Sequence, residues 1–318
     1  MKANSMTAAA AAILVLAACN RDGVIEQPVG EGYEHYRPAT SSSSAQATRV
    51  FEYRPAPGQF INETQLGGFD GSETTPAAAA AYAERRMREL NYVSLGAFGG
   101  YIVVGFDHSI DNRGGYDLAI LGNAFDTNSE PGVVYVMRDE NGNGLPDDTW
   151  YELRGSEYGK PETLHDYSVT YFRPDGEQQP VRWRDSFGEE GEIDFIRLHN
   201  QPSYYPAWIA EDSYTLTGVR LAPRTREEEG RWVRAPYDWG YADNFSPTDR
   251  MTDDDNPQAA AAPNHFKISN AVTADGRAAN LKFIDFVKVQ SAVNAKSGGL
   301  GEYSTEVIGF TDCNMTNR

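Results

Sequence analysis

The sequence is poor in cysteine and in positive charge. Only two of its 318 residues are cysteines, Cys19 and Cys313, which is too few for a disulfide framework. Acidic side chains outnumber basic ones by 46 to 28, so the formal net charge is −18. Such a surface repels nucleic-acid phosphates and anionic lipid headgroups, whereas it suits divalent cations. The composition therefore argues against nucleic-acid binding and leaves an ordinary hydrophobic core to hold the fold.

Long apolar runs are also missing, since none approaches the roughly 20 residues of a membrane-spanning helix. The alanine-rich stretch 8–17 follows Lys2 and leads into LAAC at 16–19. This arrangement is typical of a bacterial lipoprotein signal: residues 1–18 would be removed and Cys19 would carry the lipid. The alternative is an ordinary secretory signal with Cys19 as an incidental thiol. We expect an extracytoplasmic protein on the outer membrane or cell surface, bound to the membrane through its N-terminal lipid.

Composition divides the rest of the chain. Residues 19–49 lack hydrophobic periodicity and include four consecutive serines, so we expect a flexible tether. A single folded domain is expected at 50–313, followed by a tail at 314–318. Within the domain, residues 75–90 begin with a threonine cap and a proline and continue with strong helix formers, which predicts a helix.

Beyond residue 91 the pattern changes to short apolar or alternating runs separated by Gly, Asn, Asp and Pro. Nine of these runs are predicted strands: 101–106, 117–121, 133–138, 150–154, 167–173, 193–198, 213–221, 283–290 and 304–310. Nine strands with one firm helix predict an all-β fold. We expect a jelly-roll-like antiparallel β-sandwich with one or two short peripheral helices.

The segment DENGNGLPDD at 139–148 has the spacing of a calcium loop. Oxygen donors at alternate positions can converge on one hard cation, and a glycine supplies the sharp turn. The candidate ligands are Asp139, Asn141, Asn143, the Leu145 carbonyl, Asp147 and Asp148. The alternative is a solvated turn in which Asn, Gly and Asp serve backbone geometry alone. A second acidic cluster at Asp249, Asp253, Asp254, Asp255 and Asn256 is more typical of an exposed loop, with a second metal as the other possibility.

Aromatic residues are concentrated between residues 201 and 241. Rigid flat rings on loops can stack on a ligand at low entropic cost, which suits a binding surface. The candidate ligand-binding residues are Tyr204, Tyr205, Trp208, Trp232, Tyr237, Trp239 and Tyr241. The alternative is that these rings close the open end of the sandwich and fill a minor core.

Motifs for catalysis are missing from the sequence. It contains no G-x-S-x-G elbow, H-E-x-x-H helix, glycine-rich phosphate loop or Cys/His zinc set. His108, near the end of a predicted strand, is expected to hydrogen-bond a nearby carboxylate or backbone group. Enzyme status stays open, because loop carboxylates of a secreted glycan-active hydrolase could be drawn from the many Asp and Glu residues.

Several segments together resemble a group of bacterial cell-surface lipoproteins, often labelled cell-surface or PKD-domain-containing proteins. They are APGQFINE at 56–63, SLGAFGGYIVVGFDHSIDN at 94–112, GNAF at 122–125, the long run from SEPGVVYV to GSEY at 129–158, FKISNAV at 266–272 and IDFVKVQSAVN at 284–294. The resemblance implies a galactose-binding-like sandwich and an accessory role beside outer-membrane uptake systems, including those for corrinoids. It favours capture of a glycan, a corrinoid-type small molecule or a surface protein partner over catalysis. A purely structural surface protein is the third possibility.

Overall fold

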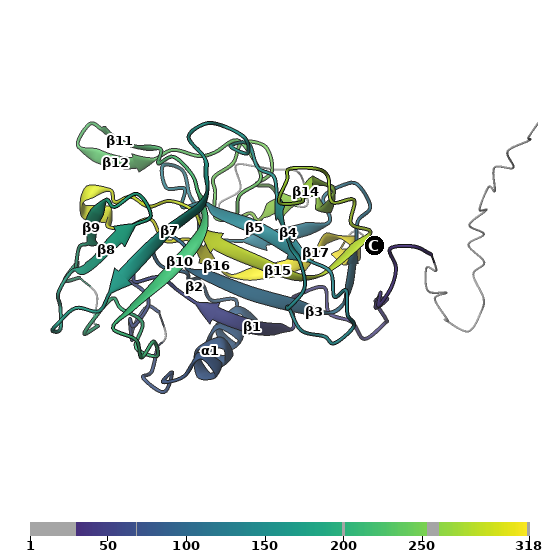
Figure 1. The fold of residues 1–318 in the computed structure, drawn as a ribbon, viewed down its shortest axis with the longest axis horizontal. Helices are drawn as coiled ribbons and strands as arrows, with labels where there is room; N and C mark the ends of the chain where they lie inside the picture. The colour runs from purple at the N-terminus through teal and green to yellow at the C-terminus, as the bar shows by residue number, and fades with distance from the viewer. Residues whose placement is uncertain (1–29, 68, 199–200, 253–260, 317–318) are drawn as a thin grey trace, which may run out of the picture.

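The strands of this protein form an all-β sandwich. A computed structural model describes residues 30–67, 69–198, 201–252 and 261–316 (Figure 1). Every strand pair within its sheets is antiparallel. The described residues contain two short α-helices, α1 (Pro76–Arg88) and α2 (Cys313–Thr316). The predicted strand-built body with one or two short helices is confirmed.

A six-stranded sheet forms the middle of the molecule (Figure 1). Its strands, in spatial order, are β1 (Arg49–Arg54), β3 (Tyr101–Asp111), β15 (Phe283–Ser291), β5 (Gly132–Met137), β6 (Trp150–Leu153) and β14 (Ala271–Val272). Segments far apart in the sequence therefore lie side by side, because β15 pairs with both β3 and β5.

Smaller sheets surround this one. A four-stranded sheet has the order β10 (Ser213–Arg220), β7 (Leu164–Phe172), β8 (Val181–Asp185) and β9 (Glu190–Ile193), and a three-stranded sheet has the order β13 (Asn264–Phe266), β4 (Leu118–Leu121) and β17 (Gly309–Asp312). Two further pairs join β2 (Val93–Ser94) to β16 (Glu306–Val307) and β11 (Thr225–Glu228) to β12 (Arg231–Arg234). Short 3₁₀ turns occur at η1 (Ile268–Asn270) and η2 (Gly298–Leu300).

The central sheet is covered on both faces, as β15 illustrates. Successive side chains of a strand point to opposite faces. Val287 and Val289 belong to the main hydrophobic core, which also contains residues of the four-stranded and three-stranded sheets. On the other face, Val133 of β5 belongs to a second, smaller core. Lys288 and Gln290 alternate with the two core valines, so this face also carries polar groups.

Helix α1 follows the sequence closely. The Thr75 hydroxyl accepts a hydrogen bond from the Ala78 N–H at 3.2 Å, and Pro76 occupies the first turn. The helix buries Tyr82 and Met87 against the body and lies beside β1 (Figure 1). The predicted helix at 75–90 is confirmed within two residues at its C-terminal end.

The predicted strands match the observed ones except at 193–198 and at 304–310. The second segment forms two short strands in different sheets, β16 (Glu306–Val307) and β17 (Gly309–Asp312). Strand β9 (Glu190–Ile193) ends at Ile193, which pairs with Val181 of β8, so the observed strand lies before the predicted one. Strands β8, β11 and β12 are rich in charged residues and lack an apolar run that would have predicted them.

The N-terminal segment differs from the expected tether. Residues 33–48 lie on the body: the Tyr36 ring packs edge-on against Phe283 at 5.1 Å, and Arg37 forms an ion pair with buried Asp285 at 3.0 Å. The Ala47 N–H donates to the Phe310 carbonyl at 3.0 Å. The folded body thus begins near residue 33 rather than 50, because backbone hydrogen bonds and a few aromatic contacts hold a segment that is poor in apolar residues.

Other expectations fall outside the described residues. The signal segment 1–18 and Cys19 lie there, as do Asp253, Asp254, Asp255 and Asn256. Within the described part of the chain, no helix has the length and apolar character needed to cross a bilayer.

Candidate functional site

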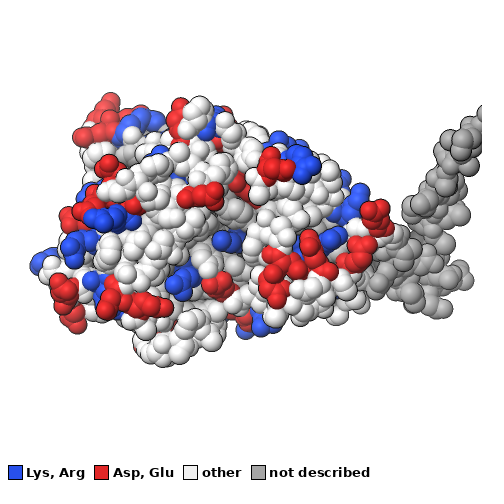
Figure 2. Space-filling view, in the orientation of Figure 1, with Lys and Arg blue, Asp and Glu red and all other residues white. Residues whose placement is uncertain are grey.

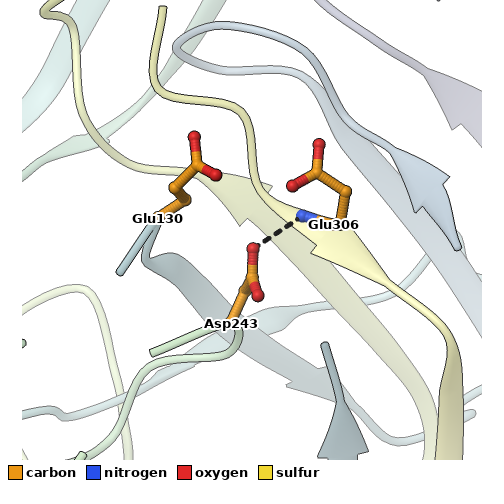
Figure 3. Close-up of side chains that lie close together, drawn as sticks. All are labelled: Glu130, Asp243 and Glu306. Atoms are coloured by element: carbon orange, nitrogen blue, oxygen red, sulfur yellow. Dashed lines mark hydrogen bonds between the residues drawn. The ribbon is translucent and has the colours of Figure 1, made fainter. Parts of the chain in front are cut away.

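Three carboxylates from distant parts of the chain meet beneath the surface. Glu130 precedes β5, Asp243 lies in the loop between β12 and β13, and Glu306 begins β16. One oxygen of each lies within 4.8 Å of the others, and all three residues are buried. Figure 3 shows the three side chains, which we call the acidic triad, directed toward a common space. Among the described residues it is the one group of three His, Cys, Asp or Glu side chains placed to hold a metal ion.

Asp243 is held in place by the backbone around it. Its carboxylate accepts the Asn123 N–H and the Glu306 N–H, each at 2.9 Å (Figure 3). A β-carbon on Gly122 would lie 2.6 Å from its Oδ1, so only glycine leaves room for the carboxylate there. Asp243 itself has φ of +52°, a left-handed conformation that is uncommon for residues other than glycine. The local backbone is thus shaped to aim this carboxylate.

Glu130 is paired with a buried cation. The Arg234 guanidinium donates to Glu130 Oε1, and the same oxygen accepts the Ser304 N–H at 2.8 Å. Arg234 is 2% exposed and also donates to the Gly301 and Glu302 carbonyls. This guanidinium therefore neutralises one of the three carboxylates and fastens the 301–304 segment beside it.

The other two carboxylates have little compensation. Burial and the nearby Glu130 charge raise the pKa of Asp243 to about 8. Burial, Glu130 and Asp243 together raise the pKa of Glu306 well above its ordinary value, against the opposing effect of the Ser304 hydroxyl at 2.9 Å. Arg250, which contacts the Ala124 carbonyl at 3.3 Å, adds a second positive charge near Asp243. At neutral pH these groups must retain protons or face a cation.

The donor set fits a hard divalent cation. All three side chains offer oxygen, and the triad contributes neither sulfur nor imidazole nitrogen, which are the ligands that zinc and copper sites favour. Arg234 is paired with Glu130, and a divalent ion would offset the charge of the ionised Asp243 and Glu306 carboxylates. The acidic triad could hold a metal ion, and sequence reasoning did not find it.

The predicted calcium loop at 139–148 has a different geometry. Asp139 is 2% exposed, and its carboxylate accepts the N–H groups of Gly142, Asn143 and Gly144 at 2.8 to 3.1 Å. The Asn141 amide nitrogen donates to Asp147 at 3.1 Å and to Asp148 at 3.2 Å. These side chains are therefore gathered in one loop, as predicted, but they are joined to one another by hydrogen bonds.

Amide donors occupy the centre of that loop. The Asn143 amide nitrogen also donates to Asp147, at 3.0 Å, while the Asn143 side-chain oxygen accepts the Leu145 N–H. His35 packs against the loop, since a β-carbon on Gly142 would lie 2.4 Å from its Nδ1. A cation would have to displace the amide nitrogens from the aspartates. Calcium in this loop remains a prediction.

The aromatic cluster is largely core rather than surface. Five of its seven members are buried: Tyr204, Tyr205, Trp208, Tyr237 and Tyr241. Trp208 stacks on Phe69 at 5.4 Å, and the Tyr237 and Tyr241 rings meet at 5.6 Å in the second core. These five side chains are buried, so their rings do not form an open binding surface in this structure. Only Trp232, 39% exposed, and half-buried Trp239 stay accessible among the seven.

Trp239 lines a pocket of about 270 Å³ together with Tyr116, His265 and Asp249. Asp249 is buried and accepts the Gly240 N–H and the Asn264 amide at 2.5 and 3.1 Å. The described member of the second acidic cluster is thus fixed by protein donors.

His108 has the structural role expected of it. The side chain is fully buried, and its ring nitrogens contact Asp107 at 2.8 Å and Asp312 at 2.9 Å. These two carboxylates raise the pKa of His108 even though burial opposes the shift.

Neither a protein-family model nor a curated protein sequence matches this chain. The resemblance to cell-surface lipoproteins therefore stays a prediction from its motifs. Two of those motifs meet at the acidic triad: GNAF at 122–125 encloses the Asp243 carboxylate, and the run at 129–158 supplies Glu130.

Proposed function

We propose that this protein is a lipid-anchored extracytoplasmic surface protein that binds calcium in the acidic triad and captures a ligand. One observation carries the proposal: three buried carboxylates approach within 4.8 Å of one another. Buried like charges at this separation are strongly unfavourable unless protons or a cation offset them.

Calcium suits this arrangement better than the other common divalent ions. It accepts six to eight oxygen ligands in irregular geometry, whereas magnesium demands a near-ideal octahedron and usually keeps several waters. The triad lies beneath the surface and brings carboxylates from three separate segments. A cation there would join β16, the residues before β5 and the 235–263 loop, and so would stabilise the fold.

The location and the capture role are supported by the sequence. The LAAC segment at 16–19 favours lipidation of Cys19, and the motif resemblance favours an accessory role beside outer-membrane uptake. Cys19→Ala should release the protein from membranes in cell fractionation. Continued membrane retention of that variant would contradict the anchor.

Calcium binding is tested by thermal unfolding of the metal-free protein with and without calcium. We expect calcium to raise the Tm of the wild type, because a ligand that binds only the folded state stabilises it. Glu306→Gln should abolish the shift. Glu227→Gln, which removes an exposed carboxylate on β11, should keep it. Equal shifts in both variants, or none in the wild type, would overturn the calcium site.

A glycan-active hydrolase is the second candidate, and the position of Glu152 favours it. Glu152 lines a cleft and lies 3.5 Å from the His165 Nδ1, and burial raises its pKa to about 7, the range of a general acid at neutral pH. Incubation with oligosaccharides followed by product analysis separates the two functions: new reducing ends that disappear in Glu152→Gln would favour the hydrolase over capture. A purely structural surface protein, the third possibility, would neither bind nor cleave them.

A further inference from the structure

A cleft of about 350 Å³ lies on the polar face of the central sheet. Strands β15, β5 and β6 contribute its floor, while β7 and β10 of the four-stranded sheet contribute a wall. This volume is in the range of small-molecule sites. None of the seven aromatic residues singled out from the sequence lines it.

Strand register places three functional groups in one row across the floor. Lys288 pairs with Tyr135, and Tyr135 pairs with Glu152. Directly paired residues of antiparallel strands project to the same face. A cationic, a phenolic and a carboxylic group therefore stand side by side, with Gln290 two residues along β15 from Lys288.

Lys288 lacks an acceptor for its ammonium hydrogens. Its Nζ lies over the Tyr101 ring at 4.4 Å and the Tyr135 ring at 5.3 Å. Within the described part of the chain the ammonium makes no hydrogen bond or ion pair, and burial lowers the pKa of Lys288 while the more distant Glu52 charge raises it. A cation held by ring faces and open to a cleft is placed to receive an anionic oxygen from a ligand.

Gln290 supplies a hydrogen-bond acceptor that has no donor among the described residues. It is 2% exposed, and its amide nitrogen donates to the Gly99 carbonyl at 2.8 Å and the Thr217 carbonyl at 3.1 Å. These two bonds fix the orientation of the amide. Its side-chain oxygen accepts no hydrogen bond from the described residues. A buried amide oxygen at the margin of a cleft is costly unless a hydroxyl or water donates to it.

The remaining lining combines rings with polar groups. Half-buried Trp150 and Tyr158 offer ring surface, and Tyr158 meets His165 edge-on at 5.5 Å. Glu152 lies 3.5 Å from the His165 Nδ1. A ligand here needs an anionic group for Lys288, hydroxyls for Gln290 and Glu152, and an apolar face for the rings.

We infer that this cleft binds a sugar acid, a pyranose-sized polyol that carries one carboxylate. The inference rests on the proposed capture role and names the chemical class of its ligand. The sugar carboxylate contacts Lys288, a hydroxyl donates to Gln290, and the ring face packs on Trp150.

The charge of the surroundings favours a single negative charge over a phosphate dianion. Among the described residues that line the cleft, Lys288 is the one lysine or arginine, and Glu152, Asp166 and His165 line it as well. Figure 2 shows that acidic side chains crowd the ends of the visible face, whereas its middle is largely uncharged, with isolated basic and acidic groups. A monoanion can therefore reach the cleft without passing a dense acidic patch.

Isothermal titration calorimetry on the calcium-loaded protein tests the inference. The probes are D-glucuronate, D-glucose, acetate and an unbranched trigalacturonide. We expect saturable binding of glucuronate and at least tenfold weaker binding of glucose and acetate, because glucose lacks the carboxylate and acetate lacks the sugar ring and its hydroxyls. Tighter binding of the trigalacturonide than of glucuronate would identify the source as a polymer rather than a free sugar.

Two lysine variants provide the matched comparison. Lys288→Met keeps an apolar chain between the tyrosines and should weaken glucuronate binding at least tenfold. Lys267→Met removes another half-buried lysine, which lies over the Tyr116 ring at 5.1 Å outside the cleft, and should change binding less than twofold. Absent glucuronate binding, or equal loss in both variants, would overturn the inference. Calcium shifts in Tm measured on the same samples report separately on the proposed metal site.

Discussion

The acidic triad and the 139–148 loop are both rich in carboxylates, yet the three carboxylates of the triad are all buried close together, whereas Asp147 of the loop is exposed. In the loop, Asp139 accepts three backbone N–H groups, and Asp147 accepts amide hydrogens from Asn141 and Asn143. In the triad, the carboxylates of Asp243 and Glu306 face each other and Glu130 across a buried space. Both groups accept hydrogen bonds from the protein, but in the triad three buried carboxylates crowd together, which raises the pKa of Asp243 and of Glu306.

Residue spacing in the sequence therefore identifies the candidate loop at 139–148, whereas the crowding of buried carboxylates is seen only in the folded protein. The loop has the residue order of a calcium site, and its carboxylates accept hydrogen bonds from its own backbone and amide groups. No short sequence spacing joins the members of the triad, and their carboxylate oxygens lie within 4.8 Å of one another in the fold. The following predictions test this difference, from the largest expected effect to the smallest.

Removal of the triad's guanidinium should have the largest effect. Arg234→Met leaves Glu130 as a buried, unpaired charge and should lower the free energy of unfolding by about 3–5 kcal/mol. Arg138→Met near the loop breaks ion pairs of 3.7 and 3.9 Å and should cost about 0–1 kcal/mol. Urea denaturation measures both. Similar losses of unfolding free energy in the two variants would mean that removing an arginine is no more costly beside the triad than beside the loop.

Stability without metal should fall as pH rises. The pKa of Asp243 is about 8 in the folded protein and near 3.8 when unfolded, so the folded state keeps a proton that the unfolded chain releases. The Asp243 contribution is complete below about pH 4 and is lost progressively up to about pH 8. Each pKa unit corresponds to about 1.4 kcal/mol.

Asp243→Asn is the control for that pH profile, because the amide cannot ionise. Unfolding free energies of the metal-free proteins from pH 4 to pH 8 should decline less steeply in the variant than in the wild type. Excess calcium should flatten the wild-type profile in the same way, since a cation stabilises the ionised carboxylates. Parallel profiles for wild type and variant would show that Asp243 is not perturbed.

Within the loop, Asp139 should matter most. Asp139→Ala leaves three N–H groups without their acceptor and should destabilise the protein by about 1–3 kcal/mol, with or without calcium. A loss that appears only in the presence of calcium would instead make Asp139 a metal ligand.

The smallest effect is expected at Asp147. Its partners are exposed amide groups, so Asp147→Ala should change the free energy of unfolding by about 0.5 kcal/mol or less. Chemical denaturation with and without calcium provides the measurement, and a larger effect confined to calcium-loaded protein would favour a metal in the loop.

The fold was largely predictable, because helix α1 and most strands carry local signals such as the Thr75 cap and the alternation of β7 and β10. Strands β8 and β11 were not, since charged residues hide their periodicity. The segment 33–48 was misjudged for a related reason: backbone hydrogen bonds to β3 and β17 order it without an apolar run.

The site was much harder to predict than the fold. Glu130, Asp243 and Glu306 are separated by more than 60 residues at each step, so no spacing joins them. They meet because β16 pairs with β2 while residues 130 and 132 hydrogen-bond to 242 and 243. The aromatic residues show the opposite case. They are close together in the sequence, but the fold distributes the buried ones between two hydrophobic cores.

Calcium binding stoichiometry is the most direct test of the central claim that the triad holds the ion. Equilibrium dialysis against calcium would be run on the wild type, on Glu306→Gln and on the loop double variant Asp147→Asn with Asp148→Asn. We predict one bound ion in the wild type and the loop variant, and none in Glu306→Gln. One ion in Glu306→Gln and none in the loop variant would contradict the claim.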